Sequence, residues 1–422
     1  MNTAAPGRLN ISRRRITGMI LVQFSGSVIA QVMVALVMLL TARQLGPTIY
    51  GQYVGTLMLA TFASIFFSLG LDIWLLREGG RDPNAAGNLA GSVLAIKLAF
   101  GSIWLVVMFI LAGWIDSQAL PATFIRWNAV IVLLDSLFAT TLTAFKATLR
   151  NAINALVEAL SDSIWLIATI VLVILGIDQA LPFLQTRFFI LLLSVTVAIL
   201  LVRWLLQATA TLTTARLALR NCFPYAASEF LTRLYMRMDV LLVSLMLGEY
   251  AVGIYSPAVS ITNALFIIPA TVHMVMVPVL SNLFEHDIRQ GWKTARNNLL
   301  VMTVIGIVLS LGVYLGIWLI PVILGDAYNG SQEVLKILSA IPFIHSISFG
   351  MASILVATNQ QKYRSTVQAI SATVNILLNL AVISWAGIQG VAVVYVISDI
   401  VLLVGYTWFV VRVYRTPVGI EA

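Results

Sequence analysis

Apolar segments long enough to cross a membrane follow one another along almost the whole chain. A spanning helix needs about 20 mostly apolar residues, and the hydropathy pattern contains about twelve such segments. Only 10% of the 422 residues are charged, whereas soluble domains carry roughly 25%. The segments are too long and continuous for β-barrel strands, so the sequence predicts an all-α polytopic membrane protein. The approximate limits are 16–42, 49–76, 88–115, 121–147, 152–176, 182–207, 222–247, 250–280, 294–321, 332–357, 362–386 and 388–412.

The distribution of Lys and Arg predicts the orientation of these segments. With the N-terminus in the cytoplasm, about 17 Lys and Arg residues lie at cytoplasmic ends and about 4 at outer ends, as the positive-inside rule requires. The outer set is Arg43, Arg126, Arg187 and Lys336. We therefore expect a multi-pass protein of the plasma (inner) membrane, surrounded by membrane lipids, with both termini in the cytoplasm. This explains the net charge of +8 without a nucleic-acid partner.

A short internal repeat indicates two related halves. Residues 45–53 read LGPTIYGQY and residues 247–255 read LGEYAVGIY, so Leu, Gly, Gly and Tyr coincide at a constant offset of 202 (247 − 45). Four matches can arise by chance in an apolar chain, but both copies fall in the outer turn after the first helix of a half, which favours duplication. We predict six-helix halves at 1–207 and 222–422, a cytoplasmic linker at 208–221, and a central cavity between the halves.

Charged residues inside the predicted spans gather on the seventh one. Glu229, Arg233 and Arg237 are spaced i, i+4, i+8 and share one helix face, whereas Asp239 points elsewhere. Arginine suits a phosphate group because its planar fork donates two hydrogen bonds and stays charged. A Glu229–Arg233 ion pair that satisfies itself is the alternative for Arg233. Arg237 has no acid one turn away, so we favour it as a substrate contact.

Other charged residues in or beside the spans have two interpretations each. Arg77 is either a snorkelling anchor or a contact to a lipid headgroup. Lys97 is a weaker candidate for substrate binding, and it is also a candidate to neutralise Glu158 or Asp162 on the fifth span. Buried acids either carry coupling ions or pair with neighbours. The acids in this group are Glu229, Asp239, Asp135, Glu158 and Asp162.

The first span has an unusually polar face. Gln23, Ser27 and Gln31 recur at i, i+4, i+8 and therefore lie on one side of the helix. One interpretation places Gln23 and Gln31 in the cavity, where their amides bond sugar hydroxyls. The other is hydrogen bonding to a neighbouring helix. Elsewhere, the pairs Gly87-xxx-Gly91 and Gly312-xxx-Gly316 have the spacing that permits close helix packing.

Motifs for catalysis are absent from the sequence. No Gly-x4-Gly-Lys-Ser/Thr loop indicates an ATP-binding domain, and no Ser/His/Asp or His-Glu-x-x-His constellation occurs. The spacing of the three histidines matches no metal motif, and the chain has one cysteine. We therefore expect a transporter without cofactor or metal, and not an enzyme. Its transport is downhill, driven by an ion gradient, or powered by another protein.

Several motifs together are similar to a known family. The first half contains Leu45-Gly46-Pro47 to Tyr53, Gly70-Leu71-Asp72, Leu76-Arg77-Glu78 and Arg81-Asp82, and the second contains Arg237-Met238-Asp239-Val240, Leu247-Gly248 and Val252 to Tyr255. They resemble the polysaccharide-export (oligosaccharide-lipid) flippases. These belong to the multidrug/oligosaccharidyl-lipid/polysaccharide exporter superfamily, which also holds the multidrug and toxin extrusion pumps.

The resemblance implies a six-plus-six bundle that moves a polyprenyl-diphosphate-linked oligosaccharide from the cytoplasmic to the outer leaflet by alternating access. By this resemblance, the cationic side chains that line the family's cavity correspond to Arg233 and Arg237, with Arg77 and Lys97 as further candidates. A polysaccharide polymerase and other synthesis proteins are the partners to expect. Two alternatives to a flippase remain. One is a drug/cation antiporter, which requires an acidic cavity for its cationic substrates, and the other is a membrane scaffold in a synthesis complex.

Overall fold

The computed structural model describes residues 13–415, and within this range every regular element is a helix. The side chains of residues 13–25 and 27, and of residues 228, 231, 232, 235 and 236, lie outside the described part. The helices are α1 (Arg13–Ala63), α2 (Ile65–Ser68), α3 (Leu71–Arg81), α4 (Ala86–Ile115), α5 (Ala122–Ala147), α6 (Asn151–Ile174), α7 (Ala180–Leu206), α8 (Leu212–Asn221), α9 (Phe223–Met246), α10 (Glu249–Ala264), α11 (Ile267–His286), α12 (Ile288–Gly316), η1 (Ile317–Leu319), α13 (Ile320–Leu324), η2 (Asp326–Tyr328), α14 (Gly330–Leu338), α15 (Ile341–Ala357) and α16 (Gln361–Arg415).

Membrane crossings account for nearly the whole described chain. Nine helical segments within residues 13–415 are long and apolar enough to span a bilayer. Two of them hold two crossings each, because the backbone turns at Gly46 in α1 (φ 72°, ψ 168°) and at Gly387 in α16 (φ 58°, ψ −150°). α9 is as long as a span but carries four charged residues, which keeps it out of the nine. With α9 and both arms of α1 and α16, the layout follows the twelve segments of the sequence prediction, and the all-α polytopic class is confirmed.

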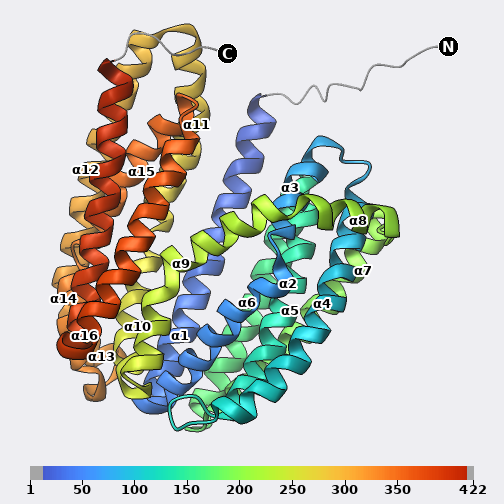
Figure 1. The fold of residues 1–422 in the computed structure, drawn as a ribbon, viewed down its shortest axis with the longest axis vertical. Coiled ribbons are helices and arrows are strands. Elements are labelled where there is room, and N and C mark those ends of the chain that lie inside the picture. The colour runs from blue at the N-terminus through green and yellow to red at the C-terminus, as the bar shows by residue number, and fades with distance from the viewer. Residues whose placement is uncertain (1–12, 416–422) are drawn as a thin grey trace.

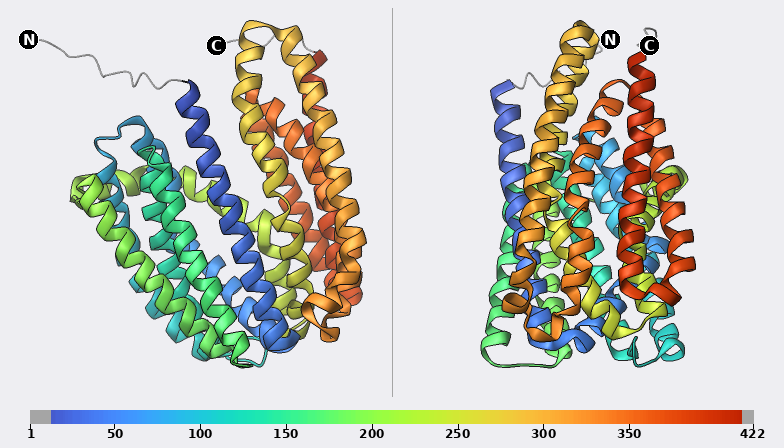
Figure 2. Two further views of the ribbon diagram at one scale, coloured as in Figure 1. Left: turned by 180° about the vertical axis from the view of Figure 1, so that it is seen from behind. Right: turned by 90° about the vertical axis from the view of Figure 1, so that its left-hand side faces the viewer.

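The crossings form two bundles that diverge toward the end of the molecule where α1 begins and α16 ends (Figure 1). α1 to α7 make the first bundle, and α10 to α16 make most of the second. α8 lies against α4 at the outer edge of the first bundle, and α9 runs obliquely from there into the second bundle. Seen from behind, the terminus-side part of α1 stands between the bundles (Figure 2). The residue limits predicted for the halves and the linker, at 207 and 222, stay a prediction.

The two copies of the repeat meet at the opposite end. Gly248 has the same unusual backbone conformation as Gly46 (φ 83°, ψ −177°), so both copies turn the chain in the same way. A Cβ atom on Gly51 would lie 1.7 Å from the carbonyl oxygen of Glu249, and one on Gly253 would lie 1.8 Å from that of Pro47. This reciprocal contact joins α1 to α10 at two positions where only glycine fits.

The two glycine pairs singled out for packing behave differently. Cβ atoms on Gly87 and Gly91 would lie 2.0 Å and 2.7 Å from the backbone of Leu206 and Thr209, so close packing is confirmed there. Gly312 and Gly316 have no described atom within 4 Å of their Cβ positions. The expectation of tight packing at the second pair was wrong, because spacing shows which residues share a face but not what that face meets.

Candidate functional site

A cavity of ≈ 480 Å³ lies between the bundles, with walls from α1, α9, α10, α11, α15 and α16. Its volume is in the range of ordinary small-molecule sites. Its apolar lining residues include Phe266, Phe349 and Leu402. The polar lining residues are Gln31, Arg237, Asn263, His345, Ser348, Arg364, Ser365, Gln368 and Tyr406.

A second cavity of ≈ 150 Å³ continues between α1, α9 and α10. Gln31, Arg237 and Asn263 line both cavities, so the two meet at these side chains. The structure thereby brings together two residues singled out in the sequence, Arg237 on α9 and Gln31 on α1. The side chain of Gln23 lies outside the described residues, and its predicted role stays a prediction.

Arg233 shares the predicted stripe with Arg237 but is held in a polar cluster. Its Nη1 donates to the carbonyl oxygen of Thr61 and to Ser64 Oγ, both at 2.6 Å, and its Nη2 forms an ion pair with Glu229. Neither cavity includes Arg233 or Glu229 among its lining residues. The contacts therefore support the internal ion pair, which was one of the two interpretations of Arg233.

The cluster also fixes a break in the second crossing. Leu69 (φ 48°) and Gly70 (φ 66°) take left-handed conformations between α2 and α3. Glu229 accepts hydrogen bonds from the Gly70 N–H (2.9 Å) and from Ser68 Oγ (3.0 Å), so α9 satisfies a backbone donor that the break leaves free. A Cβ on Gly70 would lie 2.3 Å from the backbone of Tyr225, so glycine is required at this crossing.

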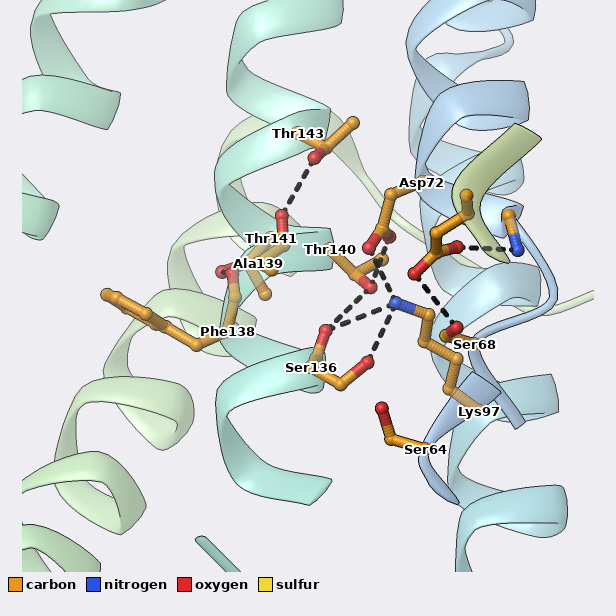
Figure 3. Close-up of polar contacts among 12 residues, drawn as sticks. Ser64, Ser68, Asp72, Lys97, Ser136, Phe138, Ala139, Thr140, Thr141 and Thr143 are labelled. Carbon is orange, nitrogen blue, oxygen red and sulfur yellow. Dashed lines mark hydrogen bonds and ion pairs between the residues drawn. The ribbon is translucent and has the colours of Figure 1, made fainter. Parts of the chain in front are cut away.

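Lys97 lies in a separate polar cluster of the first bundle (Figure 3). Its side chain is 0% exposed, and Nζ lies 2.7 Å from Asp72 Oδ2 and 3.0 Å from Ser136 Oγ. Thr140 Oγ1 donates to the other oxygen of Asp72 at 2.7 Å. Lys97 lines neither cavity, and its partner is Asp72, not the acids of α6 that it was a candidate to neutralise.

Arg187 of α7 forms ion pairs with one acid of α5 and one of α6. Its Nη2 lies 3.1 Å from Asp135 Oδ1, and its Nη1 lies 3.9 Å from Asp162 Oδ1. The guanidinium carbon also lies 3.8 Å from the ring centre of Trp165, a cation–π contact. Glu158 Oε2 is buried without a hydrogen-bond partner in the described structure. Sequence reasoning placed Arg187 among the outer anchors and missed this pairing.

The remaining predicted residues also have partners. Arg77 is more than half exposed, and its Nη1 donates to the hydroxyl of Tyr225 at 2.6 Å. Asp239 accepts a hydrogen bond from the hydroxyl of Tyr255 at 2.7 Å. Neither residue lines a cavity. Structural pairing is thus the role that the contacts support for Asp239.

Arg364 and His345 line the larger cavity, although neither is among the site residues predicted from the sequence. Arg364 lies one turn into α16, where a basic residue has the sequence pattern of a cytoplasmic anchor. His345 was considered only for metal spacing, although a histidine inside an apolar span is itself a signal of a polar site. No position in the sequence shows that α9, α15 and α16 turn these side chains toward the same space.

The family model described as "Polysaccharide biosynthesis protein" matches residues 40–331, more than half of the chain. The chain belongs to this family. The family resemblance drawn from the motifs is therefore confirmed. A Shigella dysenteriae protein named "Putative O-antigen transporter" is 23% identical over 188 residues, which is 44% of this chain and 47% of that protein. The chain thus matches about half the length of this curated relative.

Solved structures of transporters share the fold. An inward-facing multidrug resistance MATE family transporter of the MOP superfamily superposes with a TM-score of 0.72 at 14% identity, over 94% of this chain and 100% of that chain. The lipid II flippase MurJ, in an inward closed conformation, superposes with a TM-score of 0.68 at 14% identity, over 92% and 87%. A Vibrio cholerae MATE transporter gives 0.64 at 15% identity, over 95% and 97%. At these identities the likeness concerns the fold.

Proposed function

We propose that this protein is a flippase that moves a polyprenyl-diphosphate-linked oligosaccharide from the cytoplasmic to the outer leaflet for cell-surface polysaccharide synthesis. The observation that carries the proposal is the charge of the cavity lining. Arg237 and Arg364 are cationic, and none of the described lining residues of either cavity is Asp or Glu. Such a lining favours an anionic ligand, and arginine in particular binds phosphate with paired hydrogen bonds.

The rest of the lining suits a headgroup that carries sugars. Gln31, Asn263 and Gln368 offer amides that can donate to and accept from sugar hydroxyls. Phe266 and Phe349 add aromatic side chains to the lining. In this arrangement the diphosphate and its sugars occupy the cavity, while the lipid tail stays in the bilayer. The tail therefore reaches the other leaflet without leaving an apolar environment.

The arrangement of the bundles suits alternating access in the plasma membrane. α1 begins and α16 ends at the end where the bundles diverge, and the distribution of Lys and Arg favours the cytoplasm for that end. The divergence therefore corresponds to a state that faces the cytoplasm, where the lipid-linked substrate is made. A polysaccharide polymerase on the outer side is the expected downstream partner.

A drug/cation antiporter is the competing function, and the cavity lining speaks against it. Cationic substrates need acids in the binding site. Asp399 is the acid next to the larger cavity, and its side chain is 0% exposed behind His345. The acids Asp72, Asp135, Asp162, Asp239 and Glu229 are engaged in ion pairs or hydrogen bonds away from the lining.

The test is a lipid analysis of cells in which the gene is deleted. Polyprenyl-diphosphate lipids that carry a complete oligosaccharide are extracted and quantified by mass spectrometry. Arg237→Gln removes the cation shared by both cavities, and Arg203→Gln, on the exposed face of α7, is the matched control. All variants are compared at equal abundance in the membrane.

Accumulation of the complete lipid in the deletion strain, reversed by wild type and R203Q but not by R237Q, is the expected result. Normal lipid levels together with changed sensitivity to cationic drugs would support the antiporter instead. Full reversal by R237Q would support the scaffold, because a scaffold needs the protein in place but not its cavity arginine.

A further inference from the structure

His345 and Asp399 form a buried pair at the wall of the larger cavity. His345 Nδ1 lies 2.8 Å from Asp399 Oδ2, and the two residues come from different helices, α15 and α16. The imidazole ring lies flat against Phe266, with ring centres 4.0 Å apart and planes 2° apart, and its edge contacts Phe349 at 5.3 Å. Three contacts therefore fix the ring, and His345 itself lines the cavity.

The pair leaves one ring nitrogen for a ligand. Because Nδ1 is engaged by the carboxylate, Nε2 is the nitrogen that remains for a group in the cavity. A carboxylate on one nitrogen fixes both the orientation of the ring and the position of its proton. Histidine is also the side chain whose charge ordinarily changes between pH 5 and 8. As imidazolium it would add a third cation to a lining that already holds Arg237 and Arg364.

The charged and titratable groups around His345 lie on α16, α9 and α11. α16 contributes Asp399, Tyr395, Tyr406 and Arg364, α9 contributes Arg237, and α11 contributes His273, whose Nδ1 contacts Ser353 Oγ at 2.8 Å. The charged residues of α12 lie in its first three turns, whereas Gly306, ten residues further on, packs beside Phe343 and Ser346. Within this described environment, His345 is the histidine that lines the cavity together with Arg237 and Arg364.

We propose that the phosphate of a lipid-linked substrate binds in the larger cavity between Arg237, Arg364 and His345, and that protonation of His345 strengthens this binding. The proposal rests on the proposed function and adds two binding residues and a proton dependence to it. Arg364 supplies the fixed charge on the α16 side and Arg237 the fixed charge on the α9 side. His345 donates from Nε2 to a phosphate oxygen, and Asp399 acts as a positioning residue.

The test measures binding of farnesyl diphosphate, a short-chain prenyl diphosphate, to the purified full-length protein in detergent by isothermal titration calorimetry. Wild type and His345→Gln are compared across a pH series, and the quantity of interest is the ratio of their dissociation constants. The titration of the ligand cancels in this ratio. Asp399→Asn is the second variant and Arg203→Gln the control, each checked for a single symmetric peak in size-exclusion chromatography.

The dissociation constant of H345Q is expected to exceed that of wild type on the order of tenfold near pH 5.5 and to approach it near pH 8.5, because a charge-assisted hydrogen bond is lost only while the imidazole is protonated. The dissociation constant of D399N is expected to depend less on pH than that of wild type, with the larger loss of affinity at low pH. R203Q is expected to follow wild type at every pH.

A ratio that is the same at all pH values, in both H345Q and D399N, would overturn the proton dependence and leave the proposed function intact. If wild type binds farnesyl diphosphate no more tightly than farnesol, the proposed anionic substrate is overturned, and this inference with it. Arg364→Gln separates the binding residues from the proton effect: it is expected to weaken binding at every pH, and unchanged binding would remove Arg364 from the site.

Discussion

A buried lysine is tolerated in a membrane-spanning helix only when its charge is matched by close partners. Lys97 meets this condition with the Asp72 carboxylate at 2.7 Å and with two oxygens of Ser136. Asp72 is itself held by Thr140. Removing either ion would leave the other without its counter-charge inside the bundle, which is the costly way to break a buried pair.

Lys97→Met is therefore expected to destabilise the protein by roughly 3 kcal/mol, because the Asp72 carboxylate loses its counter-ion in a largely apolar bundle. The double variant Lys97→Met/Asp72→Leu is expected to recover most of that loss. Thermal unfolding in detergent, followed by circular dichroism, checks both. A double variant that is less stable than Lys97→Met alone would contradict the role assigned to this pair.

Two arginines on one helix face show how far the sequence determines the site. The spacing of Arg233 and Arg237 puts both on one stripe of α9, and this was predictable from helical periodicity. Their roles differ because of residues far away in sequence: Arg233 contacts Thr61 and Ser64 of the first bundle, whereas Arg237 lines the cavities. Arg364 escaped prediction because a basic residue near the end of a span is ordinarily an anchor.

At the scale of elements, the two copies of the repeat supply a close backbone contact between the bundles. Gly51 of α1 and Gly253 of α10 each face backbone atoms of the other copy, with no room for a Cβ. The sequence showed the repeat and the twelve spans, because apolar length and self-similarity are visible in one dimension. It did not show that the copies face each other, because that depends on the relative placement of two bundles.

Gly51→Ala is expected to destabilise the protein by about 1–3 kcal/mol, because the new methyl group pushes α1 away from α10. Gly312→Ala is the matched control, since no described atom lies within 4 Å of its Cβ position. Alanine is the better helix former, so the control is expected to be neutral or up to about 1 kcal/mol more stable. Equal melting temperatures for the two variants would contradict the close contact.

At the scale of the whole molecule, two bundles enclose cavities lined from both sides. α1 brings Gln31 from the first bundle, α15 and α16 bring His345 and Arg364 from the second, and α9 brings Arg237 from the crossing between them. A relative movement of the bundles would therefore change the spacing of the groups that surround the substrate. This links the charge of the lining to alternating access.

The orientation of the molecule is testable with single cysteines. In a Cys222→Ser background, Gln118→Cys lies in the exposed loop between α4 and α5, and Asn84→Cys lies in the exposed loop between α3 and α4. A membrane-impermeant maleimide is expected to label Cys at 118 in right-side-out vesicles, and Cys at 84 only after permeabilisation, because the basic ends face the cytoplasm. The reverse pattern would show the opposite orientation.

Transfer between leaflets by the purified protein tests the central claim most directly. Wild type, R237Q and R203Q are reconstituted into liposomes that contain a polyprenyl-diphosphate-linked sugar, and a membrane-impermeant glycosidase reports the fraction of sugar in the outer leaflet over time. We expect wild type and R203Q to make nearly all of the lipid accessible, and R237Q to act on the order of tenfold more slowly, because it lacks a charge-assisted contact. Wild type no faster than protein-free liposomes, or R237Q as fast as wild type, would contradict the proposed role of the cavity.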